Sequence, residues 1–253
     1  MKVILPLAGY ATRLYPLTEN LPKALLKING TPILEHVLEK VLNVPEVDEI
    51  FIVSNDKFYS QFIGWLDEFK SKTDLKIKIH VLNDNTKSNE DRLGAVGDIN
   101  FAVKEGGIDS DVLMLAGDNV FGFDLNCLKN LAKEKNSSVL AGFDLKDPKK
   151  LAKKFGVVLI DDNYKVTGFE EKPQHPKSSL AATMIYYLKK EDIKLLAGFY
   201  DQSFPDNWGE FAKYLAESKE LYCLVFEETW FDIGNKEQYE EVNKLAEEGK
   251  LNI

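Results

Sequence analysis

The segment near the start of the chain combines glycine with two cations in a pattern suited to phosphate binding. Residues 7–14 read LAGYATRL, and Lys23 follows a proline further on. Glycine lets backbone N–H groups approach phosphate oxygens, while Arg13 and Lys23 supply positive charge. The pattern matches neither the dinucleotide-binding G-x-G-x-x-G nor the P-loop. It predicts an anion-binding loop, and a surface loop with solvated cations is the competing interpretation.

Two aspartates stand where a divalent cation could be held. Asp118 follows the apolar run at 112–115, and Asp232 lies between apolar residues in the segment WFDIG at 230–234. A carboxylate at the end of a buried strand can hold Mg²⁺ against phosphate oxygens. Taken singly, Asp118 is more simply interpreted as a turn former and Asp232 as a helix N-cap.

Two further segments carry groups suited to the rest of a phosphorylated substrate. In FEEKP at 169–173, Lys172 can bind a phosphate while Glu171 accepts hydrogen bonds from sugar hydroxyls. In RLGAVGD at 92–98, glycines open a predicted helix after the asparagine-rich loop at 83–89, and such a turn lets a planar base lie flat on the backbone. Each segment is a common surface sequence when it is considered alone.

The hydrophobic pattern predicts an α/β fold that brings such segments to one edge of a sheet. Short apolar runs alternate with helical periodicity, which predicts right-handed βαβ units with ligands bound beyond the strands' carboxyl ends. Thr31 and Pro32 are the predicted N-cap and first residue of the first helix. The expected strands are 3–7, 50–53, 77–82, 112–115 and 139–143, and the expected helices are 33–42, 62–69, 95–103 and 125–132.

The hydrophobic pattern changes from about residue 156 onward, where strand-like segments follow one another with few helices between them. A mixed or antiparallel extension of the sheet is expected from segments 157–160, 164–169 and 181–188. Two helices, 209–217 and 236–247, are expected to flank a final strand at 221–226. The charged runs at 149–154 and 240–250 are interpreted as solvated helix faces.

Length and composition favour one soluble domain. The 253 residues are 44% hydrophobic and 29% charged, which is typical of a globular chain. A net charge of −9 argues against nucleic-acid and anionic-membrane partners. Cys127 and Cys223 match no metal-ligand spacing and favour a reducing, cytoplasmic setting. We expect no signal peptide and no membrane span.

Taken together, the segments resemble one family, the sugar-phosphate nucleotidylyltransferases, or NDP-sugar pyrophosphorylases, which include glucose-1-phosphate thymidylyltransferases. The family signature G-x-G-T-R-L-x-P-L-T and the following P-K are matched by residues 9–18 and 22–23. Its G-D, E-E-K-P-x-x-P-K-S and W-x-D-x-G motifs are matched by residues 117–118, 170–178 and 230–234. Residues 93–95 resemble the L-G-T-A turn that opens a helix in many members.

The resemblance implies a GT-A-like, Rossmann-like α/β fold, with a mixed, mostly parallel sheet flanked by helices, in one nucleotidyltransferase domain over residues 1–253. Residues 1–155 would mainly bind nucleotide, and residues 156–235 would mainly bind the acceptor. The implied reaction is attack of a sugar 1-phosphate on the α-phosphorus of a nucleoside triphosphate, with Mg²⁺ as cofactor and pyrophosphate as product. A homo-oligomer is left open, and no C-terminal β-helix or acyltransferase module is expected.

The resemblance also assigns residue roles. Arg13, Lys23 and Lys172 would be the catalytic cations, and Asp118 and Asp232 would hold the metal. The expected nucleotide-binding residues are Leu7, Ala8, Gly9, Ala11, Thr12, Arg13, Lys23, Asn83, Gly94 and Asp118. The expected sugar phosphate-binding residues are Gly156, Glu171, Lys172 and Ala182.

Three departures from the family pattern leave the substrates open. The second signature glycine is Ala11, the family's T-G is Thr183-Met184, and the glutamine that reads a pyrimidine base has no counterpart. A hexose such as glucose 1-phosphate with UTP or dTTP is the first hypothesis. A CTP-dependent transfer to a non-sugar phosphate such as phosphocholine would be favoured by aromatic residues around a quaternary ammonium. A non-catalytic sensor of sugar nucleotides is the third interpretation.

Overall fold

The computed structural model describes residues 1–203 and 206–253, which fold around one nine-stranded mixed sheet. Four strands from the first half of the chain are parallel. In this half, β1 (Lys2–Pro6) lies between β6 (Val112–Leu115) and β4 (Glu49–Ser54), and β4 pairs with β5 (Lys78–Asn83). The parallel pairing confirms the predicted βαβ units.

The second half of the chain extends this sheet in mixed order. The long strand β11 (Leu180–Leu188) is antiparallel to β6, to β8 (Ser138–Asp144) and to β9 (Gly156–Ile160). Strand β10 (Val166–Glu171) is antiparallel to β9, and β12 (Leu221–Phe226) is parallel to β8. The predicted mixed extension after residue 156 is therefore confirmed.

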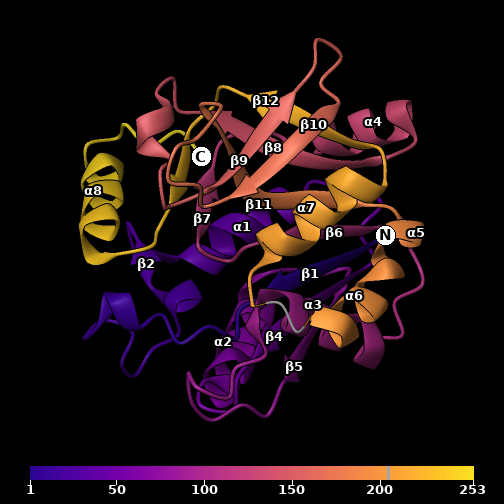
Figure 1. Ribbon diagram of the computed structural model, residues 1–253. Helices are drawn as coiled ribbons and strands as arrows, with labels where there is room; N and C mark the ends of the chain where they lie inside the picture. The colour runs from indigo at the N-terminus through magenta and orange to yellow at the C-terminus, as the bar shows by residue number, and fades with distance from the viewer. Residues whose placement is uncertain (204–205) are drawn as a thin grey trace.

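Helices cover both faces of the sheet (Figure 1). Val3 and Leu5 of β1 face one core, and Ile4 between them faces the other. A strand buried on both faces has a continuous apolar run, which is why this strand shows no polar alternation. The first core is shared with α1 (Ile33–Leu42), α2 (Tyr59–Lys72) and α4 (Leu125–Lys135), and the second with α3 (Gly94–Glu105), α5 (Lys190–Ile193), α6 (Leu195–Ser203) and α7 (Trp208–Ser218).

A short hairpin corrects the predicted start of the first helix. The expected N-cap and first helical residue form β3 (Thr31–Pro32) instead, which pairs with β2 (Lys27–Ile28). Between the two strands, Asn29 and Gly30 have φ values of 48° and 85°. Positive φ at both positions is the geometry of a tight two-residue hairpin turn. Strand pairing therefore overrides the capping pattern, and α1 begins at the residue after the hairpin.

One more strand, β13 (Trp230–Asp232), follows the expected final strand at 221–226 and forms a small separate sheet with an earlier strand. This three-residue strand pairs antiparallel with β7 (Asn119–Phe121). Three residues are too few to show a hydrophobic period, so this pairing was not predicted. The final helix α8 (Lys236–Glu247) contacts β13 and β2, and lies at the left edge of the molecule in Figure 1.

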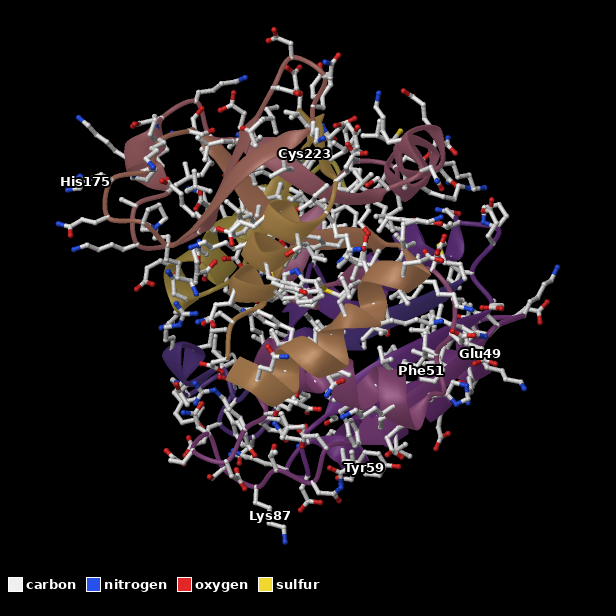
Figure 2. The ribbon with its side chains drawn as sticks, turned by 45° about the vertical axis from the view of Figure 1, so that its right-hand side comes forward. Glu49, Phe51, Tyr59, Lys87, His175 and Cys223 are labelled. Atoms are coloured by element: carbon white, nitrogen blue, oxygen red, sulfur yellow. The ribbon has the colours of Figure 1, made fainter. Side chains whose placement is uncertain are left out.

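The cysteine and membrane expectations can be compared with the structure directly. Both cysteines are free, as expected from their spacing: Cys127 is exposed, and Cys223 is buried in β12, which pairs with β8 (Figure 2). Within residues 1–203 and 206–253, no helix has the length and apolar character needed to span a bilayer.

One acidic side chain in the second core is almost fully buried. Asp98 of α3 is 5% exposed, and within the described residues its Oδ1 has no hydrogen-bond partner. Burial raises the pKa of Asp98 well above its ordinary value, and the carboxylates of Asp84 and Asp206 add to this rise. The folded chain therefore binds a proton here at pH values where the unfolded chain has released it.

We expect Asp98→Asn to stabilise the protein increasingly as the pH rises. Below an ordinary aspartate pKa of about 3.9, both states carry the proton and the two proteins should differ little. Above it, a raised folded-state pKa lowers the stability of the parent, so the variant should gain on the order of 1 kcal/mol or more by neutral pH. Urea unfolding of both proteins from pH 4 to 8 measures the difference. A difference that stays constant over this range would contradict the expectation.

Candidate active site

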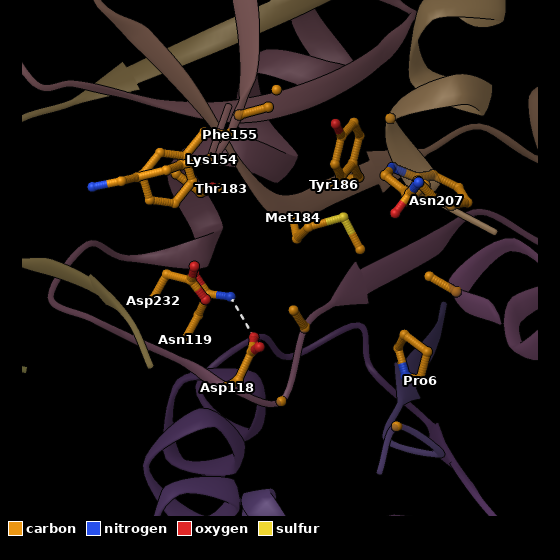
Figure 3. Close-up of a pocket in the computed structure, with 18 of the residues that line it drawn as sticks. Pro6, Asp118, Asn119, Lys154, Phe155, Thr183, Met184, Tyr186, Asn207 and Asp232 are labelled. Atoms are coloured by element: carbon orange, nitrogen blue, oxygen red, sulfur yellow. Dashed lines mark hydrogen bonds between the residues drawn. The ribbon is translucent and has the colours of Figure 1, made fainter. Parts of the chain in front are cut away.

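A cavity of about 380 Å³ opens beyond the carboxyl ends of β1 and β6 and reaches the start of α7. Figure 3 shows its walls, with residues contributed by distant parts of the chain. Eleven of the sequence-predicted residues line it: Leu7, Gly9, Ala11, Arg13, Lys23, Asp118, Gly156, Glu171, Lys172, Ala182 and Asp232. Segments far apart in sequence therefore meet in one place.

Hydrogen bonds hold the loop after β1 near both of its ends. The backbone N–H of Leu7 donates to the carbonyl of Val53 at 2.8 Å, and the hydroxyl of Thr18 donates to the carbonyl of Ala11, also at 2.8 Å. Between these points, Ala11 has a φ of 48° and precedes a short 3-10 helix (Thr12–Leu14). The loop is thus fixed at both ends, with Arg13 at the cavity wall.

Lys23 links this loop to the aspartate that follows β6. Its Nζ lies 2.7 Å from Oδ2 of Asp118, and Nδ2 of Asn119 donates to Oδ1 of Asp118 at 3.0 Å, the dashed line in Figure 3. No backbone N–H in the described part of the chain donates to this carboxylate. Asp118 is therefore held by side chains, which does not favour its interpretation as a turn former.

Asp232 is brought to Asp118 by the β7–β13 pairing. Asp232 is the register partner of Asn119, and the N–H of Ile233 donates to the carbonyl of Asp118 at 3.0 Å. The indole N–H of Trp230 donates to Oδ1 of Asn119, which fixes the start of the short strand. The N-cap of α8 is Asn235, whose Oδ1 accepts the N–H of Gln238 at 2.9 Å, so Asp232 is not the helix cap.

The carboxylate of Asp118 affects the titration of Asp232. Burial raises the pKa of Asp232 to about 6, and repulsion from Asp118 adds to the rise. The cations of Lys23, Arg13 and Lys172 oppose it. Ionising Asp232 is costly because it is buried and because Asp118 lies beside it. A bound cation would lower that cost, since its charge offsets those of both carboxylates.

The opposite wall is built from β9, β10 and the start of α7. Gly156 and Glu171 are register partners on β9 and β10, and Nζ of Lys172 lies 3.0 Å from Oε1 of Glu171 and 3.3 Å from Oδ1 of Asn207. The Glu171 carboxylate also rests on Gly209 of α7, where a Cβ would come within 1.7 Å of Oε2. Glycine there makes room for the acid.

Four predicted nucleotide-binding residues do not line this cavity. Ala8 is buried, and its carbonyl accepts a hydrogen bond from Asn55 at 2.7 Å. Thr12 is the first residue of the 3-10 helix and is exposed. Asn83 ends β5 and donates to Asp56 at 2.9 Å, and Lys87 of the following loop points outward in Figure 2.

Gly94 is the fourth, and another segment covers it. A Cβ at Gly94 would come within 2.8 Å of Cα of Asp206, whose carbonyl accepts the N–H of Ala95 at 3.0 Å. Arg92 adds an ion pair to the Asp206 carboxylate at 2.7 Å. The surface expected to receive a base is therefore occupied here by the backbone of residue 206.

Sequence reasoning missed several lining residues. Lys154 was interpreted as part of a solvated helix face, but it lies at the cavity wall. Asn207, Tyr186 and Trp208 line the cavity as well, and no local pattern marks them. Their places depend on how α7 packs on the sheet, which is a tertiary contact. The lysine run at 149–154 shows a concentration of positive charge, but the sequence does not show which of these lysines reaches the cavity.

Both residues that replace family glycines have left-handed backbone. The φ values are 48° at Ala11 and 58° at Met184. Met184 lies in β11 where the register against β8 shifts, and its carbonyl accepts the N–H of Ala116 at 3.0 Å. A residue with a Cβ costs about 1–2 kcal/mol in this conformation. The chain therefore has glycine-type turns at both positions while placing side chains in the cavity.

Comparison with known sequences identifies the family of the chain. The sequence profile of the nucleotidyl transferase family matches residues 2–249. The chain belongs to this family. Among its relatives is the bifunctional protein GlmU of Methanocaldococcus jannaschii, which is 29% identical over 249 residues, covering 96% of this chain but 54% of that protein. The chain thus spans about half the length of this relative.

Other members of the nucleotidyl transferase family match over more of their length. The glucose-1-phosphate thymidylyltransferase of Neisseria gonorrhoeae is 28% identical over 257 residues, covering 98% of this chain and 83% of that protein. Among solved structures, a UDP-glucose pyrophosphorylase complexed with UDP-glucose has a TM-score of 0.82 at 18% identity, covering 98% of both chains. This likeness confirms the predicted fold.

Replacing Ala11 with glycine should stabilise the loop. Glycine tolerates the left-handed conformation, which should add about 1–2 kcal/mol to the free energy of unfolding. The greater freedom of glycine in the unfolded chain should subtract about 0.4–1 kcal/mol from it. We therefore expect Ala11→Gly to raise the free energy of unfolding by up to about 1 kcal/mol in urea titrations. The control Ala216→Gly, in helix α7, should lower it by about 1 kcal/mol. Equal losses in both variants would show that Ala11 carries no strain.

Proposed function

We propose that this protein transfers a nucleoside monophosphate from a nucleoside triphosphate to a sugar 1-phosphate and releases pyrophosphate. The observation that carries the proposal is one cavity in which four cations and three carboxylates meet. Family membership adds support. In a chain with a net charge of −9, a local set of cations is what allows two polyanionic substrates to approach each other.

Each of the two walls would bind one of the two substrates. On the first, Arg13 and Lys23 would bind the triphosphate, with the backbone of Leu7, Gly9 and Ala11 beside it. On the second, Lys172 would bind the acceptor phosphate, while Glu171, Gly156 and Ala182 would contact the rest of the acceptor. This corresponds to a nucleotide-binding part at residues 1–155 and an acceptor-binding part at residues 156–235.

The residues between these walls fit Mg²⁺. Asp118 and Asp232 offer hard oxygen ligands. The raised pKa of Asp232 reflects its burial first and the nearby Asp118 carboxylate second, and a bound cation would offset both negative charges. No three His, Cys, Asp or Glu side chains converge on a metal site in the described ranges, so phosphate and water oxygens would complete the coordination. When bound, the ion would stabilise negative charge on the phosphates.

The reaction makes modest demands on the protein groups. A phosphate oxygen of the acceptor attacks the α-phosphorus, and the bond from that phosphorus to the bridging oxygen of the leaving pyrophosphate breaks. The acceptor is already an anion, so no strong general base is needed. The protein's work is to align the two phosphates and neutralise the charge around the α-phosphorus. Arg13, Lys23 and Lys172 are placed for this role.

A hexose 1-phosphate such as glucose 1-phosphate, with UTP or dTTP, is the first substrate pair to test. One observation favours phosphocholine with CTP as a second candidate. Tyr186 and Trp208 both line the cavity, with ring centroids 5.4 Å apart and planes at 72°, and Phe169 lies in the same wall. Aromatic faces beside the Glu171 carboxylate suit a quaternary ammonium as well as they suit a sugar ring.

Pyrophosphate release over a panel of substrates tests the proposal. The five nucleotides are ATP, CTP, GTP, UTP and dTTP, each combined with hexose 1-phosphates and phosphocholine in the presence of magnesium. We expect turnover with at least one hexose 1-phosphate. Turnover with phosphocholine and CTP alone would select the second candidate. Binding of sugar nucleotides without turnover of any pair would overturn the proposal and favour a sensor.

We expect Asp232→Asn to separate stability from activity. It removes a carboxylate that burial and Asp118 disfavour, so without metal at pH 7.5 its melting temperature should rise by a few degrees, about 1–2 kcal/mol. Pyrophosphate release should fall at least about 100-fold, and magnesium should raise the melting temperature of the parent but not that of Asp232→Asn. The control Asn235→Ala removes the actual helix cap and should cost about 1 kcal/mol while keeping the magnesium effect. Retained turnover in Asp232→Asn would rule out the two-carboxylate site.

A further inference from the structure

The four cations of the cavity differ in whether they have acidic partners. Lys23 is paired with Asp118 at 2.7 Å, and Lys172 with Glu171 at 3.0 Å. Arg13 and Lys154 make no ion pair or side-chain hydrogen bond with any other residue in ranges 1–203 and 206–253. Arg13 already has a proposed partner in the triphosphate. The charge of Lys154 is available and has no assigned role.

The backbone around Lys154 is fixed. The N–H of Lys154 and that of Phe155 both donate to the carbonyl of Leu151, at 3.0 Å and 3.2 Å, and the Leu151 side chain is fully buried. The preceding residue, Lys153, donates its N–H to the carbonyl of Pro173 at 3.0 Å. Lys154 therefore lies on a turn that is anchored in the core and tied to the segment directly after Lys172.

The turn is also packed against the strand that carries Asp232. The ring of Phe155 lies 5.4 Å from the ring of Trp230, the first residue of β13. Figure 3 shows Lys154 on the same side of the cavity as Asp232, with Met184 between it and Asn207. The turn that carries Lys154 thus joins the acceptor wall, through Pro173, to the strand of Asp232, through Trp230.

We propose that Lys154 binds the phosphate of the acceptor together with Lys172, and so positions the attacking oxygen. This proposal rests on the proposed function and adds a binding residue to it. A phosphate monoester carries nearly two negative charges, and Lys172 is already shared with Glu171. A second cation without a carboxylate partner supplies the missing charge, and its ammonium can donate to an oxygen that Lys172 does not reach.

The position of Lys154 favours the acceptor over the triphosphate. Its turn is joined to Pro173 and precedes Gly156 on β9, both on the acceptor wall. The loop that would hold the triphosphate comes from the opposite half of the chain, after β1. A cation on the acceptor wall should therefore alter the Michaelis constant of the acceptor and leave that of the nucleotide unchanged.

Steady-state kinetics of Lys154→Gln test the assignment, with Lys153→Gln as the matched control. Lys153 is the neighbouring exposed lysine and does not line the cavity. We expect Lys154→Gln to raise the acceptor KM about tenfold, the effect of losing one charge-assisted hydrogen bond, with the nucleotide KM and the melting temperature unchanged. Lys154→Arg should restore most of the loss, and Lys153→Gln should match the parent.

Three results would overturn the assignment. The first is an acceptor KM in Lys154→Gln within twofold of the parent. The second is an equal change in Lys153→Gln, which would indicate a general charge effect. The third is a rise in the nucleotide KM alone, which would place Lys154 at the triphosphate.

A binding experiment keeps this proposal separate from the proposed function. Calorimetric titration with glucose 1-phosphate and with inorganic phosphate needs no turnover. We expect Lys154→Gln to weaken both about tenfold, and Lys153→Gln to weaken neither. If the parent releases no pyrophosphate yet shows this pattern, the proposed function fails while the phosphate role of Lys154 stands. Unchanged binding in Lys154→Gln would reject the role whatever the activity.

Discussion

The pairing of β13 with β7 is the interaction on which the candidate active site depends. It joins residues 119–121 to residues 230–232 and places one carboxylate beside another. The hydrogen bonds from Trp230 to Asn119 and from Ile233 to Asp118 hold this arrangement. A short two-stranded sheet therefore holds two charges together against their repulsion. Lys23, which reaches Asp118 from the first loop, offsets part of that repulsion.

Much of the site could be predicted because its motifs are local. Arg13 and Lys23 lie in the loop after β1, Asp118 follows β6, and the carboxyl ends of parallel strands meet at one edge. Glu171 and Lys172 were predicted from a motif that occupies one strand end. The fold was predictable for the same reason, since strands buried on both faces and amphipathic helices have clear periods.

The rest depended on contacts between distant segments. Nothing local in the sequence indicates that residue 206 covers Gly94, because that contact joins residues separated by more than a hundred positions. Lys154 belongs to a lysine-rich run, and its place at the cavity depends on tertiary contacts such as the packing of Phe155 on Trp230 and the hydrogen bond from Lys153 to Pro173. The pair Asn29 and Gly30 is typical of a hairpin turn. The next two residues, Thr31 and Pro32, also fit the start of a helix, and the sequence alone does not decide between the two structures.

The late position of β13 has a consequence for how the molecule is made. A nascent chain contains the four parallel strands of its first half once residue 115 has been added, long before residue 232 is synthesised. Such a chain can begin to fold its N-terminal half, as nascent chains do. During that interval, Val120 and Phe121 of β7 lack their strand partner, and Asp118 stands without a second carboxylate. The carboxylate of Asp232 is therefore added late in synthesis, after the strands of the large sheet have been made.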